Sequence, residues 1–215
     1  MTAAGDMREL ILCQGLTEDS AEAVRLRCYL ALLEKWNARI NLTAATEWSA
    51  VGRLFGEALW AARFYPGTTG RHLDIGSGAG FPAIPMKIMI PGMRLDLVES
   101  RARRAAFLET VAAELRLENV RVFCRRIEEH LGDPEVPAYD TVSWKGLKLS
   151  RGAWKLLRER SLAATQLWLF HGARLPLADP RAAAGHLGLV ARRPTPGHAG
   201  HYLSIYHVSR ETSST

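Results

Sequence analysis

The sequence has few cysteines and no long apolar run. Its three cysteines, Cys13, Cys28 and Cys124, are scattered without a C-x-x-C pair, so we expect buried or free thiols in a reducing cytosol. No stretch is apolar for long enough to cross a membrane, and the N-terminus lacks the basic start and apolar core of a signal peptide. These absences favour a cytoplasmic protein with no membrane association, and we expect no metal site.

The composition that is present suits a globular α/β protein. The chain has 215 residues, of which 47% are hydrophobic, and this is enough for one α/β domain and a small additional segment. Its formal net charge is +6. A basic excess suits an anionic partner, most simply nucleic acid, but an ordinary basic protein without such a partner fits the charge equally well.

The first part of the chain has helical periodicity. One helix is expected to follow Thr17 as its N-cap, and another to run from Thr46 to Tyr65, just before Pro66-Gly67. We therefore expect three parts: an N-terminal helical extension over 1–66, a main domain over 67–210 and a disordered tail over 211–215.

From Arg71 onwards, strands alternate with helices. Strands are expected at 71–75, 93–99, 119–124, 138–143 and 166–170, and helices at 82–89, 101–115, 126–131 and 150–163. This alternation predicts a mostly parallel, Rossmann-like sheet with right-handed crossovers. Two further β-rich runs, Leu187–Arg193 and His201–Val208, are expected to close one edge as an antiparallel pair, which gives seven strands.

Residues 72–82 contain a glycine-rich turn. A short apolar run is followed by Gly76, Gly78 and Gly80, which predicts a strand, a tight turn and the start of a helix. Dinucleotide enzymes use G-x-G-x-x-G here, but the second gap in this chain is one residue short. Asp74 suits a cationic ligand group, and Glu99 at the end of the next expected strand suits ribose hydroxyls. The pattern favours S-adenosylmethionine; the alternative is an ordinary β–α turn with incidental glycines.

The expected sheet places these residues in one crevice. In an open sheet of this kind, the ligand lies at the carboxyl ends of the strands. Four segments should therefore surround it: Gly76–Phe81, Glu99, Ile127-Glu128 and Ser143–Lys145.

Several short blocks together match the pattern of one known family. They are LEKWN at 33–37, INLT at 40–43, DIGSGAGFPAIP at 74–85, ES at 99–100, RAAFL at 104–108 and RIEE at 126–129. On these blocks, which lie within roughly residues 10–145, the sequence resembles the RsmG (glucose-inhibited division protein B) family of bacterial methyltransferases, which modify N7 of a guanine in 16S ribosomal RNA. The resemblance implies the class I S-adenosylmethionine-dependent methyltransferase fold.

The resemblance also implies cofactor contacts. It assigns them to Gly76, Phe81, Ile127 and Glu128, with Glu99 on the ribose, and the loop adds Asp74, Gly78 and Gly80. Structural alternatives remain open: Phe81 packs against the helix, Ile127 lies in the core, and Glu128 caps or pairs on a surface turn.

The departures from the family pattern lie on the substrate side. The family's R-H-x-x-D-S-L is RLFGEAL at 53–59, so its His and Ser are absent. The family's S-R-A is Ser143-Trp144-Lys145, its lysine after strand five is His171, and its R-H pair near the last strand is Gly200-His201. A divergent relative with another substrate is therefore an alternative.

The expected substrate-binding residues follow the fourth strand. Trp144 is expected to stack on a flipped base, with a core position as the alternative. Lys145, Lys148 and Arg151 begin a basic cluster that suits phosphates, with a solvated helix face as the alternative. This cluster continues through Lys155, Arg158 and Arg160.

The expected function is S-adenosylmethionine-dependent N7-methylation of a guanine in 16S ribosomal RNA by a monomer, with the RNA or the small ribosomal subunit as partner. Guanine N7 has a free lone pair, so no general base is needed and we expect no acid–base catalytic residue. Two alternatives remain: methyl transfer to a small molecule or protein, and a non-catalytic cofactor-binding protein that interacts with RNA.

Overall fold

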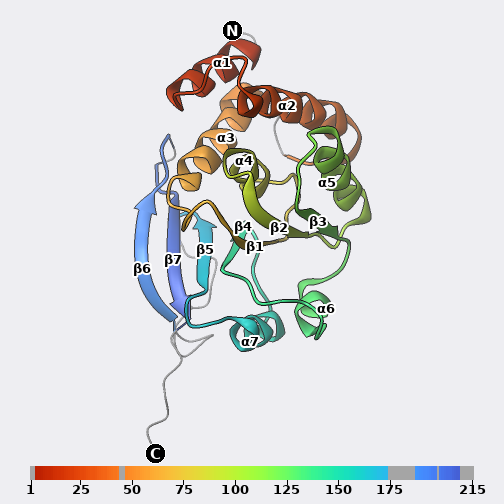
Figure 1. Ribbon diagram of the computed structural model, residues 1–215, viewed down its shortest axis with the longest axis vertical. Helices are drawn as coiled ribbons and strands as arrows, with labels where there is room; N and C mark the ends of the chain where they lie inside the picture. The colour runs from red at the N-terminus through yellow and green to blue at the C-terminus, as the bar shows by residue number, and fades with distance from the viewer. Residues whose placement is uncertain (1–2, 44–46, 174–186, 198, 209–215) are drawn as a thin grey trace, which may run out of the picture.

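The computed structural model describes residues 3–43, 47–173, 187–197 and 199–208. One seven-stranded sheet crosses the molecule in the order β3-β2-β1-β4-β5-β7-β6 (Figure 1). Its parallel part consists of β1 (Thr69–Ile75), β2 (Gly92–Val98), β3 (Val120–Phe123), β4 (Thr141–Lys145) and β5 (Gln166–His171). Its antiparallel edge consists of β7 (Tyr202–Val208) and β6 (Leu187–Pro194). The mostly parallel sheet and the closing antiparallel pair are thus confirmed.

Helices cover both faces of the sheet (Figure 1). One face carries α1 (Ala3–Cys13), α2 (Ala21–Ile40), α3 (Trp48–Ala62), α4 (Ala83–Met89) and α5 (Ala102–Glu114), and the other carries α6 (Ile127–Gly132) and α7 (Arg151–Arg160). Successive strand residues point to opposite faces, so each strand contributes to both hydrophobic cores. Leu95 and Leu97 pack on the α1–α5 side, whereas Leu73 and Ile75 pack on the α6–α7 side. Burying each such side chain contributes about 1.5–3 kcal/mol.

The helices before the sheet differ from the prediction at their ends. Ser20, not Thr17, is the N-cap of α2, because the Ser20 hydroxyl oxygen accepts a hydrogen bond from the Ala23 N–H at 3.2 Å. α3 ends at Ala62 rather than Tyr65, because the following N–H groups turn back to carbonyls three residues earlier, as Tyr65 does to Ala62. Thr46 and the predicted tail at 211–215 lie outside the described residues.

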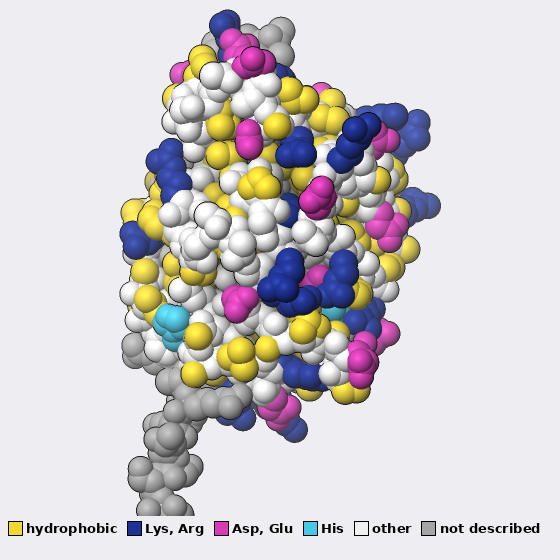
Figure 2. All heavy atoms as spheres, in the orientation of Figure 1, with side chains coloured by type: hydrophobic (Ala, Val, Ile, Leu, Met, Phe, Trp, Pro, Cys, Tyr) yellow, Lys and Arg dark blue, Asp and Glu magenta, His cyan; other side chains and the backbone are white. Residues whose placement is uncertain are grey.

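The charge on the visible face is distributed. Figure 2 shows Lys and Arg side chains there in several separate groups, with acidic side chains between them. In the part of the chain that the structure describes, no helix combines the length and apolar character that a membrane crossing needs. The same residues contain no group of three or more His, Cys, Asp or Glu side chains placed to hold a metal ion.

Candidate functional site

The predicted glycine turn joins β1 to α4 through backbone conformations that require glycine. Gly76, Gly78 and Gly80 have φ values of +68°, +56° and +91°, which glycine adopts readily and other residues do not. Gly80 has the least space, because a Cβ there would lie 2.7 Å from Ile84 Cγ1. The hydroxyl of Tyr29, on α2, donates to the carbonyl preceding Gly80. A helix of the N-terminal segment therefore helps to fix the turn.

Glu99 follows β2 and holds the same turn from the other side. Its Oε2 accepts a hydrogen bond from the Gly78 N–H at 2.9 Å, and its Oε1 accepts one from the Arg101 N–H at 2.8 Å. The residue is only 5% exposed. A carboxylate has about four acceptor positions, so two remain for a ligand after these bonds. The backbone thus fixes the orientation of an acid suited to a pair of hydroxyls.

A cavity of about 460 Å³ lies at the carboxyl ends of β1, β2 and β4. Of the residues predicted for the site, it is lined by Gly76, Glu99, Ile127, Glu128, Lys145 and Lys148. The structure thus brings together four segments that the sequence placed around one crevice. Asp74, Gly78, Gly80, Phe81, Trp144 and Arg151 are not among the lining residues.

Asp74 lies behind the turn and is buried with one oxygen unsatisfied. Its Oδ1 accepts a hydrogen bond from the Ser143 hydroxyl at 2.6 Å, whereas its Oδ2 has no hydrogen-bond partner in the described part of the molecule. Burial raises the pKa of Asp74 to about 7. A buried, unpaired carboxylate oxygen is costly, and a nearby cationic group would relieve that cost.

Glu128 and Ile127 occupy the cavity wall and also have structural roles. Glu128 Oε1 accepts a hydrogen bond from the Ser150 hydroxyl at 2.6 Å, and this bond lowers the pKa of Glu128. The same Ser150 oxygen caps α7 by accepting from the Ala153 N–H at 3.0 Å. Ile127 is 8% exposed and belongs to the α6–α7 core. Both alternatives considered for these two residues therefore hold alongside their place in the cavity.

The prediction that Trp144 stacks on a base is wrong. The side chain is 1% exposed and packs edge-to-face on Trp154, with ring centroids 5.4 Å apart. Strand alternation is the physical reason, because Trp144 and Val142 point into the α6–α7 core.

Phe81 is also packed in the core. It is 8% exposed, and the centroids of the Phe81 and Phe55 rings are 5.1 Å apart. Its ring thus packs in the core, and cofactor contact by Phe81 stays a prediction.

The residues of the basic cluster that begins at the end of β4 have different roles. Lys145 forms an ion pair with Glu57 on α3, which partly balances its charge, and phosphate contact stays a prediction for it. Arg160 donates to the Leu131 carbonyl at 3.0 Å and to the Asp133 carbonyl at 2.6 Å, so it caps α6 instead of facing a ligand. Lys148 and Arg151 are exposed, so phosphate contact stays a prediction for them.

Sequence reasoning missed Glu57. Its side chain is 3% exposed although it is acidic, and the sequence signal is an acid within the apolar run of α3, between Phe55 and Leu59. A buried carboxylate needs a partner, and the partner lies on a strand that is distant in the sequence.

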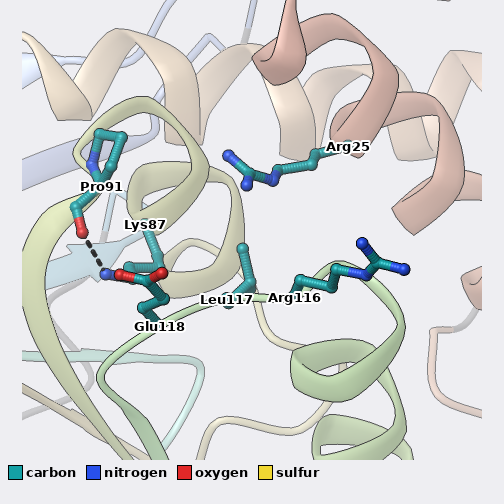
Figure 3. Close-up of a pocket in the computed structure, with 6 residues that line it drawn as sticks. All are labelled: Arg25, Lys87, Pro91, Arg116, Leu117 and Glu118. Atoms are coloured by element: carbon teal, nitrogen blue, oxygen red, sulfur yellow. Dashed lines mark hydrogen bonds between the residues drawn. The ribbon is translucent and has the colours of Figure 1, made fainter.

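A second hollow, of about 180 Å³, lies where β2 and β3 begin, at the opposite ends of the strands from the cavity. Figure 3 shows Lys87 there with its ammonium directed at the Pro91 carbonyl, a hydrogen bond of 2.5 Å. A second bond, of 2.6 Å, goes to the Met93 carbonyl. Lys87 is 2% exposed, and this burial lowers its pKa. These bonds give Lys87 a structural role in the turn between α4 and β2.

Comparison with known proteins identifies the family. The family model described as "rRNA small subunit methyltransferase G" matches residues 22–173. A protein named ribosomal RNA small subunit methyltransferase G from Roseiflexus castenholzii is 41% identical over 131 residues, covering 60% of this chain and 56% of the relative. The protein of that name from Streptococcus pyogenes is 33% identical over 156 residues, covering 71% of this chain and 60% of the relative. The chain thus spans less than two thirds of the length of these relatives.

Solved structures share the fold at low sequence identity. The glycopeptide N-methyltransferase MtfA in complex with S-adenosyl-L-methionine matches 73% of this chain and 94% of its own, with a TM-score of 0.58 at 14% identity. The putative methyltransferase yhhF from Escherichia coli matches 73% of this chain and 87% of its own, with a TM-score of 0.56 at 15% identity. These likenesses confirm the class I methyltransferase fold. The match to the family model covers more than half of the sequence, and the chain belongs to the rRNA small subunit methyltransferase G family.

Proposed function

We propose that the chain is an S-adenosylmethionine-dependent methyltransferase that methylates N7 of a guanine in 16S ribosomal RNA. The observation that carries this proposal is the carboxylate of Glu99. Two backbone N–H groups orient it, and it lines a cavity at the carboxyl ends of the parallel strands. An acid in this position suits the two hydroxyls of an adenosine ribose.

The residues around the cavity fit this cofactor. Glu99 would hold the ribose, and Gly76 and Ile127 offer a backbone and an apolar side chain for the adenosine. The unpaired Oδ2 of Asp74 supplies a negative charge behind the turn, which suits a ligand that carries an ammonium and a sulfonium. A pyrophosphate, in contrast, would lie close to two acids, so the site disfavours a dinucleotide.

When bound, S-adenosylmethionine supplies a methyl group on a sulfonium centre. The N7 lone pair of guanine forms the new N–C bond while the pair of the broken C–S bond stays with sulfur, and no proton leaves N7. The protein then has to align the base and exclude water rather than remove a proton. This fits a cavity in which Glu99 and Glu128 already accept hydrogen bonds from the protein.

An RNA substrate is supported by the charge around the cavity and by the relatives. Three exposed basic residues, Arg101, Arg126 and Lys148, line it and suit phosphates of an RNA backbone. The curated relatives are named for ribosomal RNA of the small subunit. We propose 16S ribosomal RNA or the small ribosomal subunit as the partner, and a monomer as the active form.

One observation favours a second candidate, methyl transfer to a small molecule or protein. The family's S-R-A arginine is Trp144 here, near the end of β4, and that side chain is buried in the core, so the side chain that reaches the cofactor and substrate region in the family is absent. Incubation with labelled S-adenosylmethionine and separate RNA, protein and small-molecule fractions from cells lacking this gene distinguishes the two. We expect label in the RNA, whereas label confined to another fraction would favour the second candidate. Calorimetry should show binding of S-adenosylmethionine and no binding of NAD. Binding of NAD without binding of S-adenosylmethionine would overturn the cofactor assignment.

A further inference from the structure

Lys145 lies at the cavity end of β4, beside the glycine turn. β4 pairs with β1 so that Trp144 is opposite Ile75, which puts Lys145 level with Gly76. Lys145 and Gly76 both line the 460 Å³ cavity. The side chain of Lys145 is 26% exposed, so it is not fully buried by its neighbours.

Glu57 fixes the ammonium in this place. The Glu57 side chain is 3% exposed and pairs with Lys145 from α3. Separating the pair would leave the buried carboxylate of Glu57 without a compensating charge, so Lys145 is held in place. An ammonium has three donors, and the bond to Glu57 is the one that the described residues provide. Donors therefore remain for a ligand in the cavity.

This arrangement suits a directional hydrogen bond better than long-range attraction. The pair with Glu57 has no net charge, so it adds little to the general attraction for RNA, in contrast to the exposed Lys148. A fixed donor at short range distinguishes bases by their acceptors. On the edge of the base that carries N7, guanine presents the acceptor O6, whereas adenine presents the donor N6–H₂.

We propose that Lys145, held by Glu57, donates a hydrogen bond to O6 of the target guanine and thereby selects guanine over adenine. The bond to O6 leaves the N7 lone pair free for methyl transfer and orients the ring so that N7 faces the cofactor. This inference rests on the proposed function and names a specificity residue for it, at a position where the sequence pattern led us to expect a phosphate contact.

The test compares bases within one RNA that the wild-type protein methylates. The target guanine is replaced by 2-aminopurine, which keeps N7 but lacks O6, and kcat/KM is measured for both RNAs. Wild type should prefer guanine by about tenfold or more, the value of a hydrogen bond to a charged donor. Lys145→Met should lose most of that preference, and Lys148→Met, the matched control, should keep it while weakening binding of both RNAs.

A second variant separates recognition from folding. Lys145→Met alone leaves Glu57 buried without its partner, so Glu57→Gln/Lys145→Met removes both charges together. Lys145→Arg keeps a donor and should retain a preference for guanine. Calorimetry of S-adenosylmethionine binding verifies that each variant is folded and loaded. A folded double variant with the wild-type preference would overturn the proposal for Lys145 alone, whereas a wild-type protein that methylates no RNA would overturn the proposed function as well.

Discussion

The hydroxyl of Ser143 donates a hydrogen bond to Oδ1 of Asp74 over 2.6 Å and joins β4 to β1 directly behind the glycine turn. His72 Nε2 lies 2.8 Å from the same hydroxyl oxygen. Since the single hydroxyl proton goes to Asp74, His72 has to donate from Nε2. Burial lowers the pKa of His72 to about 3, so the ring is neutral at physiological pH. The only acid in this chain of bonds, Asp74, therefore sits among neutral partners.

Asp74 should make stability depend on pH. Burial raises its folded-state pKa to about 7 from an ordinary value of 3.8. The contribution of a group with a raised pKa is complete below the unfolded-state value and is lost as pH rises through the folded-state value. Wild type should therefore lose stability relative to Asp74→Asn between about pH 4 and pH 7, with a constant difference above.

Denaturant unfolding of both proteins across this range measures the effect. Glu99, Tyr29 and His72 surround Asp74 in both proteins, so the difference isolates Asp74. Parallel pH profiles for the two proteins would contradict the assignment. Ionised Asp74 also favours a cationic ligand, so S-adenosylmethionine affinity should rise as pH passes about 7.

Glu99→Gln should weaken cofactor binding more than it weakens the fold. The carboxylate accepts hydrogen bonds from two backbone N–H groups. In the amide, an N–H₂ donor would face one of these donors, and that hydrogen bond would be lost. We expect at least about a tenfold loss of S-adenosylmethionine affinity in calorimetry, from lost charge-assisted hydrogen bonds. Glu129→Gln, on the exposed side of α6, is the control and should bind normally. Equal affinities for all three proteins would remove Glu99 from the site.

Gly80→Ala should destabilise the protein more than Gly78→Ala. Both glycines have positive φ, which costs a residue with a Cβ about 1–2 kcal/mol. The Cβ at Gly78 would meet Arg104 Nη1 at 3.6 Å, an ordinary contact, whereas at Gly80 it would lie 2.7 Å from Ile84 Cγ1. Overpacking adds about 1–3 kcal/mol at Gly80. Urea midpoints measure both changes, and a larger loss for Gly78→Ala would contradict the geometry of the turn.

Lys87→Met should lower stability while leaving the cofactor site intact. The change removes two hydrogen bonds to the Pro91 and Met93 carbonyls, and we expect a loss of about 1–3 kcal/mol. Lys155→Met, on an exposed face of α7, should change stability by less than about 0.5 kcal/mol. Cofactor affinity should be unchanged, because Lys87 lies near the amino ends of the strands and the cavity at their carboxyl ends. A stable variant would show that the ammonium is dispensable to the α4–β2 turn.

Local patterns in the sequence were sufficient for most of the fold. Short apolar strands that alternate with amphipathic helices predict a parallel sheet. The helices cover both faces of such a sheet, so its strands are apolar on both sides. Side chains also alternate between the two faces within a strand. Val142 and Trp144 are two residues apart and share one face, which indicates a core position for Trp144. Thr17 and Ser20 are both good N-caps three residues apart, and local sequence did not decide between them.

The substrate side depends on contacts that local patterns do not contain. Glu57 and Lys145 are 88 residues apart in the chain and meet only because α3 packs near the end of β4. Glu99, in contrast, was predictable because it ends a strand next to the glycine turn in a parallel sheet. Glu99 thus has a fixed position relative to the neighbouring strand, whereas the Glu57–Lys145 pair joins two segments that are distant in the sequence.

The proposed function is tested most directly by identifying the nucleoside that receives the methyl group. 16S ribosomal RNA from cells lacking this gene is incubated with the purified chain and labelled S-adenosylmethionine, then digested to nucleosides and analysed by mass spectrometry. We expect label in 7-methylguanosine, and at least about tenfold less of it when Glu99→Gln replaces the wild type at limiting cofactor. Label in any other nucleoside, or unlabelled RNA beside active cofactor binding, would contradict it.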